Sequence, residues 1–310
     1  MTATEPAAAR AWALLQAYEQ ARAHWPAVPA GHHRPQSVGG LVDLLPQADA
    51  VLLDAFGVLN LGAQAIPGAA QMLQRLRELK VPFRIVSNAA SVPKATLVQR
   101  YHRMGLPLQA EDFVTSRDVV AAALAAAPQR RWAVVAPVGA DCSDLPLAQA
   151  RRCEAGALQD DDDAVLFLCA QGWDEVAQQR LEHDLRRRPR PVWVANPDLI
   201  SPWEGGWARE PGGWCLHLAA RTGATVQMFG KPFAAIFERA LASLPPGVRR
   251  TQVWMLGDTL HTDVLGALAA GLRAALVTGA GASTGLDVQR AAATTGIVPH
   301  AVLPFIGPGP

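Results

Sequence analysis

The sequence has 310 residues, of which 50% are hydrophobic, and a formal net charge of +1 at pH 7. A chain of this length and composition can bury a sizeable core, and we expect two domains. The small net charge gives no electrostatic reason to expect nucleic acid as a partner. No uncharged apolar run approaches the roughly 18 residues of a membrane span, so we expect no membrane partner.

Cysteine spacing and the start of the chain suggest a cytoplasmic protein. The four cysteines, Cys142, Cys153, Cys169 and Cys215, show no Cys-x-x-Cys spacing. Reduced thiols are the simplest account of them, and we expect no zinc site. The first six residues also lack the basic start of a signal peptide.

Residues 1–45 are expected to form an N-terminal helix and a linker. Apolar residues recur at helical spacing over 7–25, which predicts an amphipathic helix. Residues 26–40 are rich in Pro, Gly and His and are typical of a linker. His32 and His33 are adjacent there, and such a pair is more often solvated than bound to metal.

Residues 46–128 alternate between strand and helix patterns. The apolar residues predict strands over 51–53, 81–86 and 113–115, and helices over 69–79, 93–104 and 117–127. Alternation of this kind indicates a parallel, right-handed α/β unit.

Residues 129–224 have a different character. Most of the tryptophans lie there, and candidate strands fall at 132–136, 164–169 and 192–195. The acidic run Asp160–Asp163 and the basic run Arg186–Arg188 are expected to be solvated ends of elements. We interpret this region as a second, smaller α/β domain inserted into the first.

The first pattern resumes over 225–310. It predicts strands over 225–229, 253–256 and 274–277, helices over 233–243 and up to Gly271, and a surface strap over 299–310. The expected domains are therefore 46–128 with 225–310, and 129–224.

Polar side chains follow four of the expected strands at their carboxyl ends: Asp54, Ser87 with Asn88, Lys231, and Asp258 with Asp263. In an open parallel sheet such ends converge on one ligand site. Carboxylates can hold Mg²⁺ through hard oxygen ligands, and a lysine can face a phosphate. A carboxylate can also be the nucleophile of a covalent route. The residue types therefore suit phosphoryl transfer.

Four motifs carry a resemblance to the haloacid dehalogenase-like (HAD) hydrolase superfamily. They are Asp54-Ala55-Phe56-Gly57-Val58-Leu59, Ser87-Asn88-Ala89, Gly230-Lys231-Pro232 and Gly257-Asp258-Thr259-Leu260-His261-Thr262-Asp263. The insertion between the second and third motifs, with Asn196-Pro197-Asp198, resembles subclass IIA of nitrophenyl-, sugar- and nucleotide-phosphatase-like proteins. The resemblance covers about residues 48–305.

The resemblance implies a Rossmann-like, doubly wound parallel sheet with an inserted C2-type cap domain that sets specificity. It implies that Asp54 is the nucleophile, and that Asp54, the Phe56 carbonyl and Asp258 bind Mg²⁺ with Asp263 close by. Ser87 and Lys231 would act in catalysis. The expected phosphate-binding residues are Phe56, Gly57, Ser87, Asn88, Ala89 and Lys231. A small phosphorylated metabolite is the implied ligand, and a homodimer through the cap is the implied assembly.

Phe56 departs from the usual phosphatase pattern, which has a second Asp two residues after the nucleophile. A phenyl ring cannot exchange the proton that this Asp supplies, and general acid–base help is typically worth ~10²–10⁴-fold. We expect a Mg²⁺-dependent phosphatase of weak activity. The alternatives are an impaired HAD fold that only binds a phosphorylated ligand, and dehalogenase-like, non-phosphate hydrolysis. His261 is the next candidate for the proton source.

Three tryptophans in a Gly- and Pro-rich stretch of the expected cap, Trp203, Trp207 and Trp214, form a further hypothesis. We expect at least one of them to face the ligand site or a subunit interface, because loops carry function more often than core helices do. Ordinary core packing is the alternative, since large aromatic residues dominate cores as well.

Overall fold

The computed structural model describes residues 6–29, 34–203 and 206–308. The chain divides into two compact units. Unit 1 comprises Met1–Ser87, Lys94–Val114 and Lys231–Pro310, and unit 2 comprises Asn88–Pro93 and Thr115–Gly230. His32 and His33 lie outside the described residues. No helix in the described part of the chain is long and apolar enough to cross a membrane.

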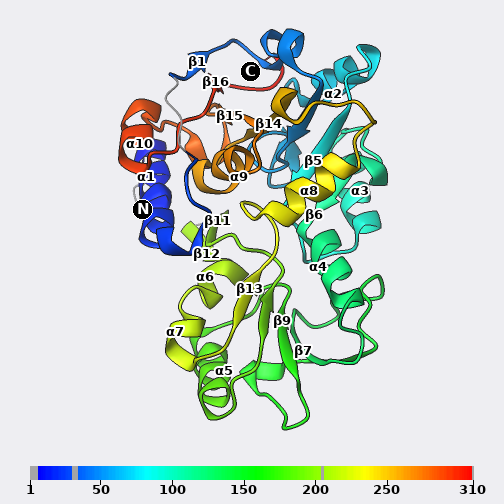
Figure 1. Cartoon of the computed structure of the whole chain (residues 1–310), viewed down its shortest axis with the longest axis vertical. Coiled ribbons are helices and arrows are strands. Elements are labelled where there is room, and N and C mark those ends of the chain that lie inside the picture. The colour runs from blue at the N-terminus through cyan, green and yellow to red at the C-terminus, as the bar shows by residue number, and fades with distance from the viewer. Residues whose placement is uncertain (1–5, 30–33, 204–205, 309–310) are drawn as a thin grey trace. The chain divides into compact units, whose positions relative to one another are not determined.

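Unit 1 is an α/β fold around a seven-stranded sheet with the order β1-β16-β15-β14-β2-β5-β6 (Figure 1). Along this spatial order, β1 pairs with β16, β16 with β15, β15 with β14, β14 with β2, and β2 with β5, and all of these pairings are parallel. The strands are β1 (Gln36–Ser37), β2 (Ala50–Leu53), β5 (Phe83–Ser87), β6 (Phe113–Thr115), β14 (Val253–Gly257), β15 (Arg273–Val277) and β16 (Ala301–Leu303). A hairpin of β3 (Asn60–Leu61) and β4 (Gln64–Ala65) follows β2.

The helices of unit 1 are α1 (Ala7–Gln20), α2 (Ala69–Glu78), α3 (Lys94–Arg103), α8 (Ala234–Ala242), α9 (Leu265–Ala269) and α10 (Val288–Thr295). Two short turns matter for the site: the π-helical η7 (Leu260–Val264) and the 3₁₀ turn η8 (Gly281–Ser283). All four residues of β2 are buried, as expected for a central strand of a parallel sheet that is covered on both faces. The apolar face of α2, with Met72, Leu73 and Leu76, is buried as its spacing predicts.

Unit 2 contains a five-stranded, fully parallel sheet with the order β13-β10-β9-β7-β8. The strands are β7 (Arg131–Val135), β8 (Gln149–Arg152), β9 (Ala164–Phe167), β10 (Val192–Val194) and β13 (Val226–Met228), with a separate hairpin of β11 (Ile200–Trp203) and β12 (Gly206–Arg209). The helices are α4 (Ser116–Ala125), α5 (Glu175–Arg187), α6 (Pro211–Cys215) and α7 (Leu218–Thr222).

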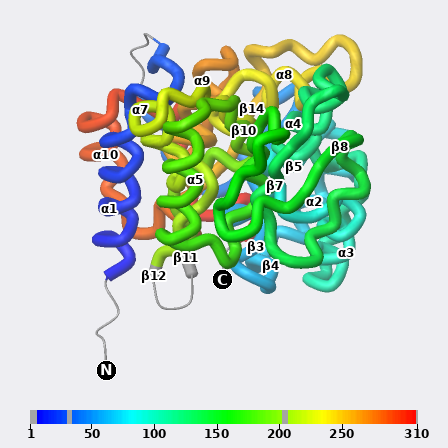
Figure 2. The backbone as a smooth tube through the Cα atoms, turned by 90° about the horizontal axis from the view of Figure 1, so that it is seen from below, coloured from blue at the N-terminus to red at the C-terminus, as the bar shows by residue number. Residues whose placement is uncertain are grey.

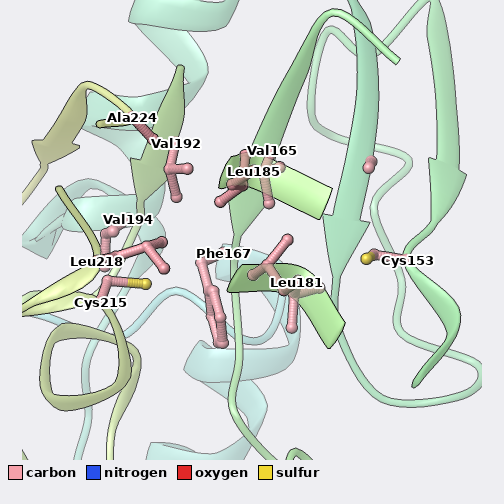
Figure 3. Packing of buried hydrophobic residues seen from close by; sticks show 12 residues of the cluster. Cys153, Val165, Phe167, Leu181, Leu185, Val192, Val194, Cys215, Leu218 and Ala224 are labelled. Atoms are coloured by element: carbon pink, nitrogen blue, oxygen red, sulfur yellow. The ribbon is translucent and has the colours of Figure 1, made fainter. Parts of the chain in front are cut away.

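The core of unit 2 lies between its sheet and α5 (Figure 3). Phe167 of β9 and Leu181 of α5 belong to this buried cluster, together with Cys215 and Leu218 from α6 and α7. The strands predicted at 132–136, 164–169 and 192–195 are confirmed, so the central region is an α/β unit as expected. All four cysteines are free thiols.

Three expectations about the fold are wrong. The strand expected over 225–229 in the first domain is β13, which pairs with β10 in the sheet of unit 2. The tail over 299–310 is not only a surface strap, because β16 pairs with β15 and buries Ala301 and Leu303. The linker contributes β1, which pairs with β16 at the edge of the sheet. Local apolar patterns predict a strand but not its partner, which explains the first error.

The acidic run is only partly solvated. Asp162 is buried, forms an ion pair with Arg151 and accepts a hydrogen bond from the Gln159 N–H at 2.7 Å. Asp161, in contrast, pairs with Arg131 at the surface. The run therefore closes the turn before β9, and the expectation that all of it is solvated is wrong at Asp162.

Candidate active site

The register of unit 1 brings three of the predicted residues to one edge of the sheet. Leu53 of β2 lies opposite Leu256 of β14 on one side and opposite Ile85 of β5 on the other. Asp54 therefore follows β2 at the level where Asp258 follows β14, and its N–H donates to the Leu256 carbonyl at 2.8 Å. Ser87 ends β5 and is buried. The predicted convergence of strand ends holds for these three elements.

Lys231 joins this edge from a different direction than predicted. It follows no strand of the core sheet, because β13 belongs to unit 2, and it precedes α8 instead. Its Nζ lies 2.5 Å from Oδ1 of Asp54 and 2.7 Å from Oδ1 of Asp263. Burial alone would lower the pKa of Lys231, but the charges of Asp263 and Asp54 outweigh it and raise that pKa. Lys231 is therefore a fixed ammonium between two carboxylates.

Asp258 is held by the loop that follows β15. Its Oδ2 accepts a hydrogen bond from the Ala282 N–H at 2.7 Å, and Ser283 Oγ donates to its carbonyl at 2.6 Å. Thr259 Oγ1 donates to Oδ1 at 3.0 Å. Burial, with the nearby charge of Asp54, raises the pKa of Asp258 to about 7. Burial and the charge of Asp54 also raise the pKa of Asp263.

Asp54, Asp258 and Asp263 fit a divalent metal ion. Each offers one carboxylate oxygen, and these oxygens all lie within 4.8 Å of one another. Burial first, and then the charge of Asp54, raises the pKa of Asp258. Three buried carboxylates share this space with the ammonium of Lys231, which leaves an excess of negative charge. A divalent cation on oxygen ligands would balance it. The structure thus brings together the carboxylates predicted as metal ligands.

Two glycines let the backbone approach Asp258 closely. Gly57 has a φ of 76°, and a Cβ placed there would lie 2.0 Å from Oδ2 of Asp258. Gly281 has a φ of 72°, and a Cβ there would lie 1.9 Å from the same oxygen. Any side chain at either position would displace the carboxylate. The glycine that follows Phe56 is therefore required by the site as well as by the turn.

Asn60 and Tyr101 belong to the surroundings of the site and were missed in the sequence. The Tyr101 hydroxyl donates to Oδ1 of Asn60 at 3.1 Å, and Asn60 Nδ2 donates to the Gly62 carbonyl at 2.8 Å. Burial, with the charge of Asp54, raises the pKa of Tyr101. The hydrogen bonds of Asn60 and Tyr101 therefore stabilise the turn that carries the half-buried Phe56. Tyr101 reads as an ordinary apolar-face residue of a helix, so the sequence held no signal for it.

Ala282 and Ser283 were also missed, although the sequence did hold a signal for them. They follow β15, and the loop after a strand of this sheet is expected at the same edge as Asp54. A strand was correctly predicted over 274–277. Applying the same rule to its carboxyl end would have identified the loop.

The predicted phosphate loop crosses from unit 1 to unit 2 after Ser87. In unit 2, Asn88 Nδ2 donates to Oδ1 of Asp198 at 2.8 Å, which gives the Asn-Pro-Asp motif a structural role. Arg117 Nη1 donates to the Ala90 carbonyl at 2.7 Å, so a buried guanidinium holds the loop that follows Ala89.

His261 does not present its Nε2 to the acidic cluster. The side chain is 1% exposed, its Nε2 lies 2.6 Å from Oε1 of Glu19, and its ring stacks on Tyr18. Burial lowers the pKa of His261, which Glu19 partly offsets. These contacts give no support to His261 as the proton source.

A pocket of about 630 Å³ lies within unit 2. Its lining residues include Ser91, from the loop held by Arg117, together with Trp173, Glu210 and Trp214. Glu210 accepts hydrogen bonds from Ser201 Oγ and, at 3.2 Å, from Asn196 Nδ2. Pockets of this size accommodate small molecules.

The structure tests only part of the hypothesis that Trp203, Trp207 or Trp214 faces the ligand site or a subunit interface. Trp207 and Trp214 are half-buried in unit 2, and Trp214 lines the pocket, with the guanidinium of Arg209 4.4 Å from its ring centre. The side chain of Trp203 lies outside the described residues. A subunit interface, and with it the homodimer, stays a prediction.

Known proteins are similar to this chain in sequence and in fold. The model of the haloacid dehalogenase-like hydrolase family matches residues 51–144, and a HAD-hydrolase-like model matches residues 228–303. A D-glycerol 3-phosphate phosphatase of Mycobacterium tuberculosis is 32% identical over 74% of this chain and 62% of its own length. An acid sugar phosphatase of Staphylococcus aureus is 27% identical over 79% of this chain and 92% of its own length. This chain thus spans less than two thirds of the mycobacterial relative.

Solved structures agree on the fold. A possible sugar phosphatase from Cytophaga hutchinsonii superposes with a TM-score of 0.78 at 24% identity, covering 89% of this chain and 100% of that one. A glycerol phosphate phosphatase from M. tuberculosis in complex with calcium gives a TM-score of 0.61 at 26% identity, covering 76% and 67%. The fold and the matched regions place the chain in one class of proteins. The chain belongs to the haloacid dehalogenase-like hydrolases, and its relatives are consistent with subclass IIA.

Proposed function

We propose that this protein is a Mg²⁺-dependent phosphatase that hydrolyses a small phosphomonoester through a phosphorylated Asp54. The observation that carries the proposal is the buried chain Asp54–Lys231–Asp263, with an oxygen of Asp258 in reach of both carboxylates. The names of the relatives support a phosphorylated sugar or polyol as the substrate class.

The reaction would proceed in two displacements. The Asp54 carboxylate attacks the phosphorus, and the bond between phosphorus and the leaving oxygen breaks. Water then attacks the phosphorus of the aspartyl phosphate, which releases inorganic phosphate and restores the carboxylate. Lys231 and Ser87 would hold the transferring group, because negative charge spreads over its outer oxygens.

Asp54, Asp258 and the Phe56 carbonyl would hold the Mg²⁺ ion, with Asp263 behind them. All of these ligands are hard oxygens, which Mg²⁺ prefers. When bound, the ion supplies positive charge against the phosphoryl oxygens. The carboxylate excess in this part of unit 1 supports the assignment.

Phe56 stands where the usual phosphatase pattern has an Asp, so no residue is assigned to protonate the leaving group. Without a positioned acid, roughly 3–5 kcal/mol of barrier lowering is lost, which corresponds to the usual value of general acid–base catalysis. We therefore propose that turnover is fastest for leaving groups that need little protonation. The phenylalanine at position 56 also favours a second candidate function. In it, the protein binds a phosphorylated ligand without hydrolysing it.

The pocket of unit 2 would bind a small organic group and so set the substrate preference of the protein. Its two tryptophan rings offer apolar faces, and the Glu210 carboxylate can accept hydrogen bonds from substrate hydroxyl groups. Trp214→Ala should raise KM with little change in kcat, because it removes binding that is equal in the ground and transition states. A fall in kcat with unchanged KM would contradict this role.

A substrate panel tests the proposal. Phosphate release from sugar phosphates, glycerol 3-phosphate and p-nitrophenyl phosphate is measured with Mg²⁺, with EDTA, and for Asp54→Asn. Wild type should need the metal, and Asp54→Asn should lose roughly 10⁴-fold or more in kcat. The matched control is Asp161→Asn, an exposed carboxylate of unit 2 that should behave as wild type. Tight ligand binding without release would favour the second candidate instead.

A further inference from the structure

Helix α1 lies before the region that the family models match, yet it packs against the catalytic loops of unit 1. The first match begins at residue 51. The buried face of α1 carries Ala11, Leu14, Leu15 and Tyr18. Figures 1 and 2 both show α1 beside α10, and the Arg290 guanidinium lies 4.2 Å from the centre of the Trp12 ring. The helix is thus an integral part of unit 1.

The first catalytic loop that α1 contacts is η7, which carries Asp263. Glu19 Oε1 lies 2.6 Å from His261 Nε2, and the Tyr18 ring stacks on the His261 ring at 5.3 Å and 21°. Since an ionised carboxylate only accepts hydrogen bonds, Nε2 carries the proton and donates to Glu19. Glu19 and Tyr18 therefore fix the position of the His261 ring. His261 lies two residues before Asp263 in the sequence.

The second loop is the one that holds Asp258. Helix α1 contacts η8, whose Ala282 N–H and Ser283 hydroxyl bind Asp258. Two residues further on, a Cβ on Gly285 would lie 3.1 Å from the Ala8 nitrogen, so the backbones are close there. One helix thus touches the segments that position Asp258 and Asp263.

The contacts continue past the end of α1. Trp25 Nε1 donates to the Tyr18 carbonyl at 3.1 Å, and the Trp25 ring packs at 6.0 Å from Phe233, which directly precedes α8. Lys231 lies two residues before Phe233. The segment from Ala7 to Trp25 therefore reaches the surroundings of each charged group of the site except Asp54.

We propose that α1 is an intramolecular clamp on the metal site, and that Glu19 is a positioning residue that fixes Asp263 through its hydrogen bond to His261. The catalytic consequence rests on the proposed function, whereas the effect on metal binding does not need a substrate. A helix that merely covered apolar surface would need neither the part-buried hydrogen bond to His261 nor the stacked ring. Residues that orient metal ligands without binding the metal themselves typically contribute about 10–100-fold to metal affinity or activity.

The test compares Glu19→Ala, Glu19→Gln and the control Gln16→Ala, which changes an exposed residue of the same helix. Mg²⁺ binding is measured by calorimetry on the substrate-free protein, and kcat, KM and the free energy of unfolding are measured in parallel. Glu19→Ala should weaken Mg²⁺ binding about tenfold and lower kcat more than it raises KM. Glu19→Gln should recover most of the affinity, because its carbonyl oxygen still accepts from His261. Gln16→Ala should match wild type.

Unchanged Mg²⁺ affinity in Glu19→Ala, with or without a loss of stability, would overturn the clamp. If Glu19→Ala does not fold, Tyr18→Leu decides in its place, since it removes the stacked ring and keeps apolar bulk, and it should weaken Mg²⁺ binding likewise. A wild type that neither binds Mg²⁺ nor releases phosphate would refute the proposed function itself. A wild type that does both while the Glu19 variants match it would refute the clamp alone.

Discussion

The Nζ atom of Lys231 lies 2.7 Å from Oδ1 of Asp263, and both side chains are almost completely buried in unit 1. Removing two charges from water is costly, and a pair in these surroundings persists only when its geometry and hydrogen bonds compensate. Lys231 also reaches Asp54, so a single ammonium balances part of the charge of two carboxylates. This arrangement links the stability of unit 1 to its proposed chemistry.

Lys231→Met is expected to destabilise unit 1 and to abolish turnover. The substitution leaves two buried carboxylates without their partner, which typically costs about 3–5 kcal/mol of unfolding free energy. Lys231→Met/Asp263→Asn should regain part of that loss and none of the activity. Urea unfolding of both variants measures the effect, and a single variant as stable as wild type would contradict the account.

Gly57→Ala should harm the metal site more than Gly62→Ala does. Both glycines have positive φ, 76° and 56°, so each substitution should cost roughly 1–2 kcal/mol of backbone strain. A Cβ at Gly62 meets nothing within 4 Å, whereas at Gly57 it collides with Asp258. Only Gly57→Ala should weaken Mg²⁺ binding, by about tenfold or more. Calorimetric titration compares the two, and equal affinities would speak against Asp258 as a ligand.

Phe56→Asp should raise activity towards alkyl phosphates more than towards aryl phosphates. An alkoxide must be protonated as it leaves, whereas a nitrophenolate departs more readily without help. The gain is bounded by ~10²–10⁴-fold, the usual value of a positioned acid. The measurement is the ratio of kcat/KM for the two substrate types, with Phe56→Leu as the apolar control. An unchanged ratio in a folded, Mg²⁺-binding variant would show that the proton has another source.

Glu210 should make unit 2 less stable as the pH rises. Burial raises the pKa of Glu210 above its ordinary value of 4.5, although the Ser201 hydroxyl partly offsets this. Ionisation is thus harder in the folded chain, and the contribution of this group is fully present below the unfolded pKa and lost as the pH rises through the folded pKa.

Glu210→Gln should flatten that pH dependence, because an amide does not titrate. Urea unfolding at a series of pH values from 4.5 upward measures the slope. Glu154→Gln is the matched control, since the Glu154 side chain is 73% exposed. If Glu210→Gln keeps the wild-type slope, another group causes it.

The sequence was informative where chemistry follows local structure. Asp54 and Asp258 were predicted at the ends of buried strands, and the register of β2 and β14 places them side by side. It was not informative about partners in space. Nothing local distinguishes β13 from a core strand, and nothing in the composition of 7–25 shows that Glu19 meets His261, 242 positions away in the chain. Long-range pairings depend on the packing of the whole chain, which periodicity does not encode.

In the proposed reaction, Asp54 becomes phosphorylated during turnover. The most direct measurement is an acid-quenched single turnover with excess enzyme and Mg²⁺, followed by mass spectrometry of the peptide that carries Asp54. We predict a phosphoryl group on Asp54 in wild type that appears before inorganic phosphate is released, and none in Asp54→Asn. Release of phosphate by Asp54→Asn at the wild-type rate, or turnover with no phosphorylated Asp54 at any quench time, would contradict the account.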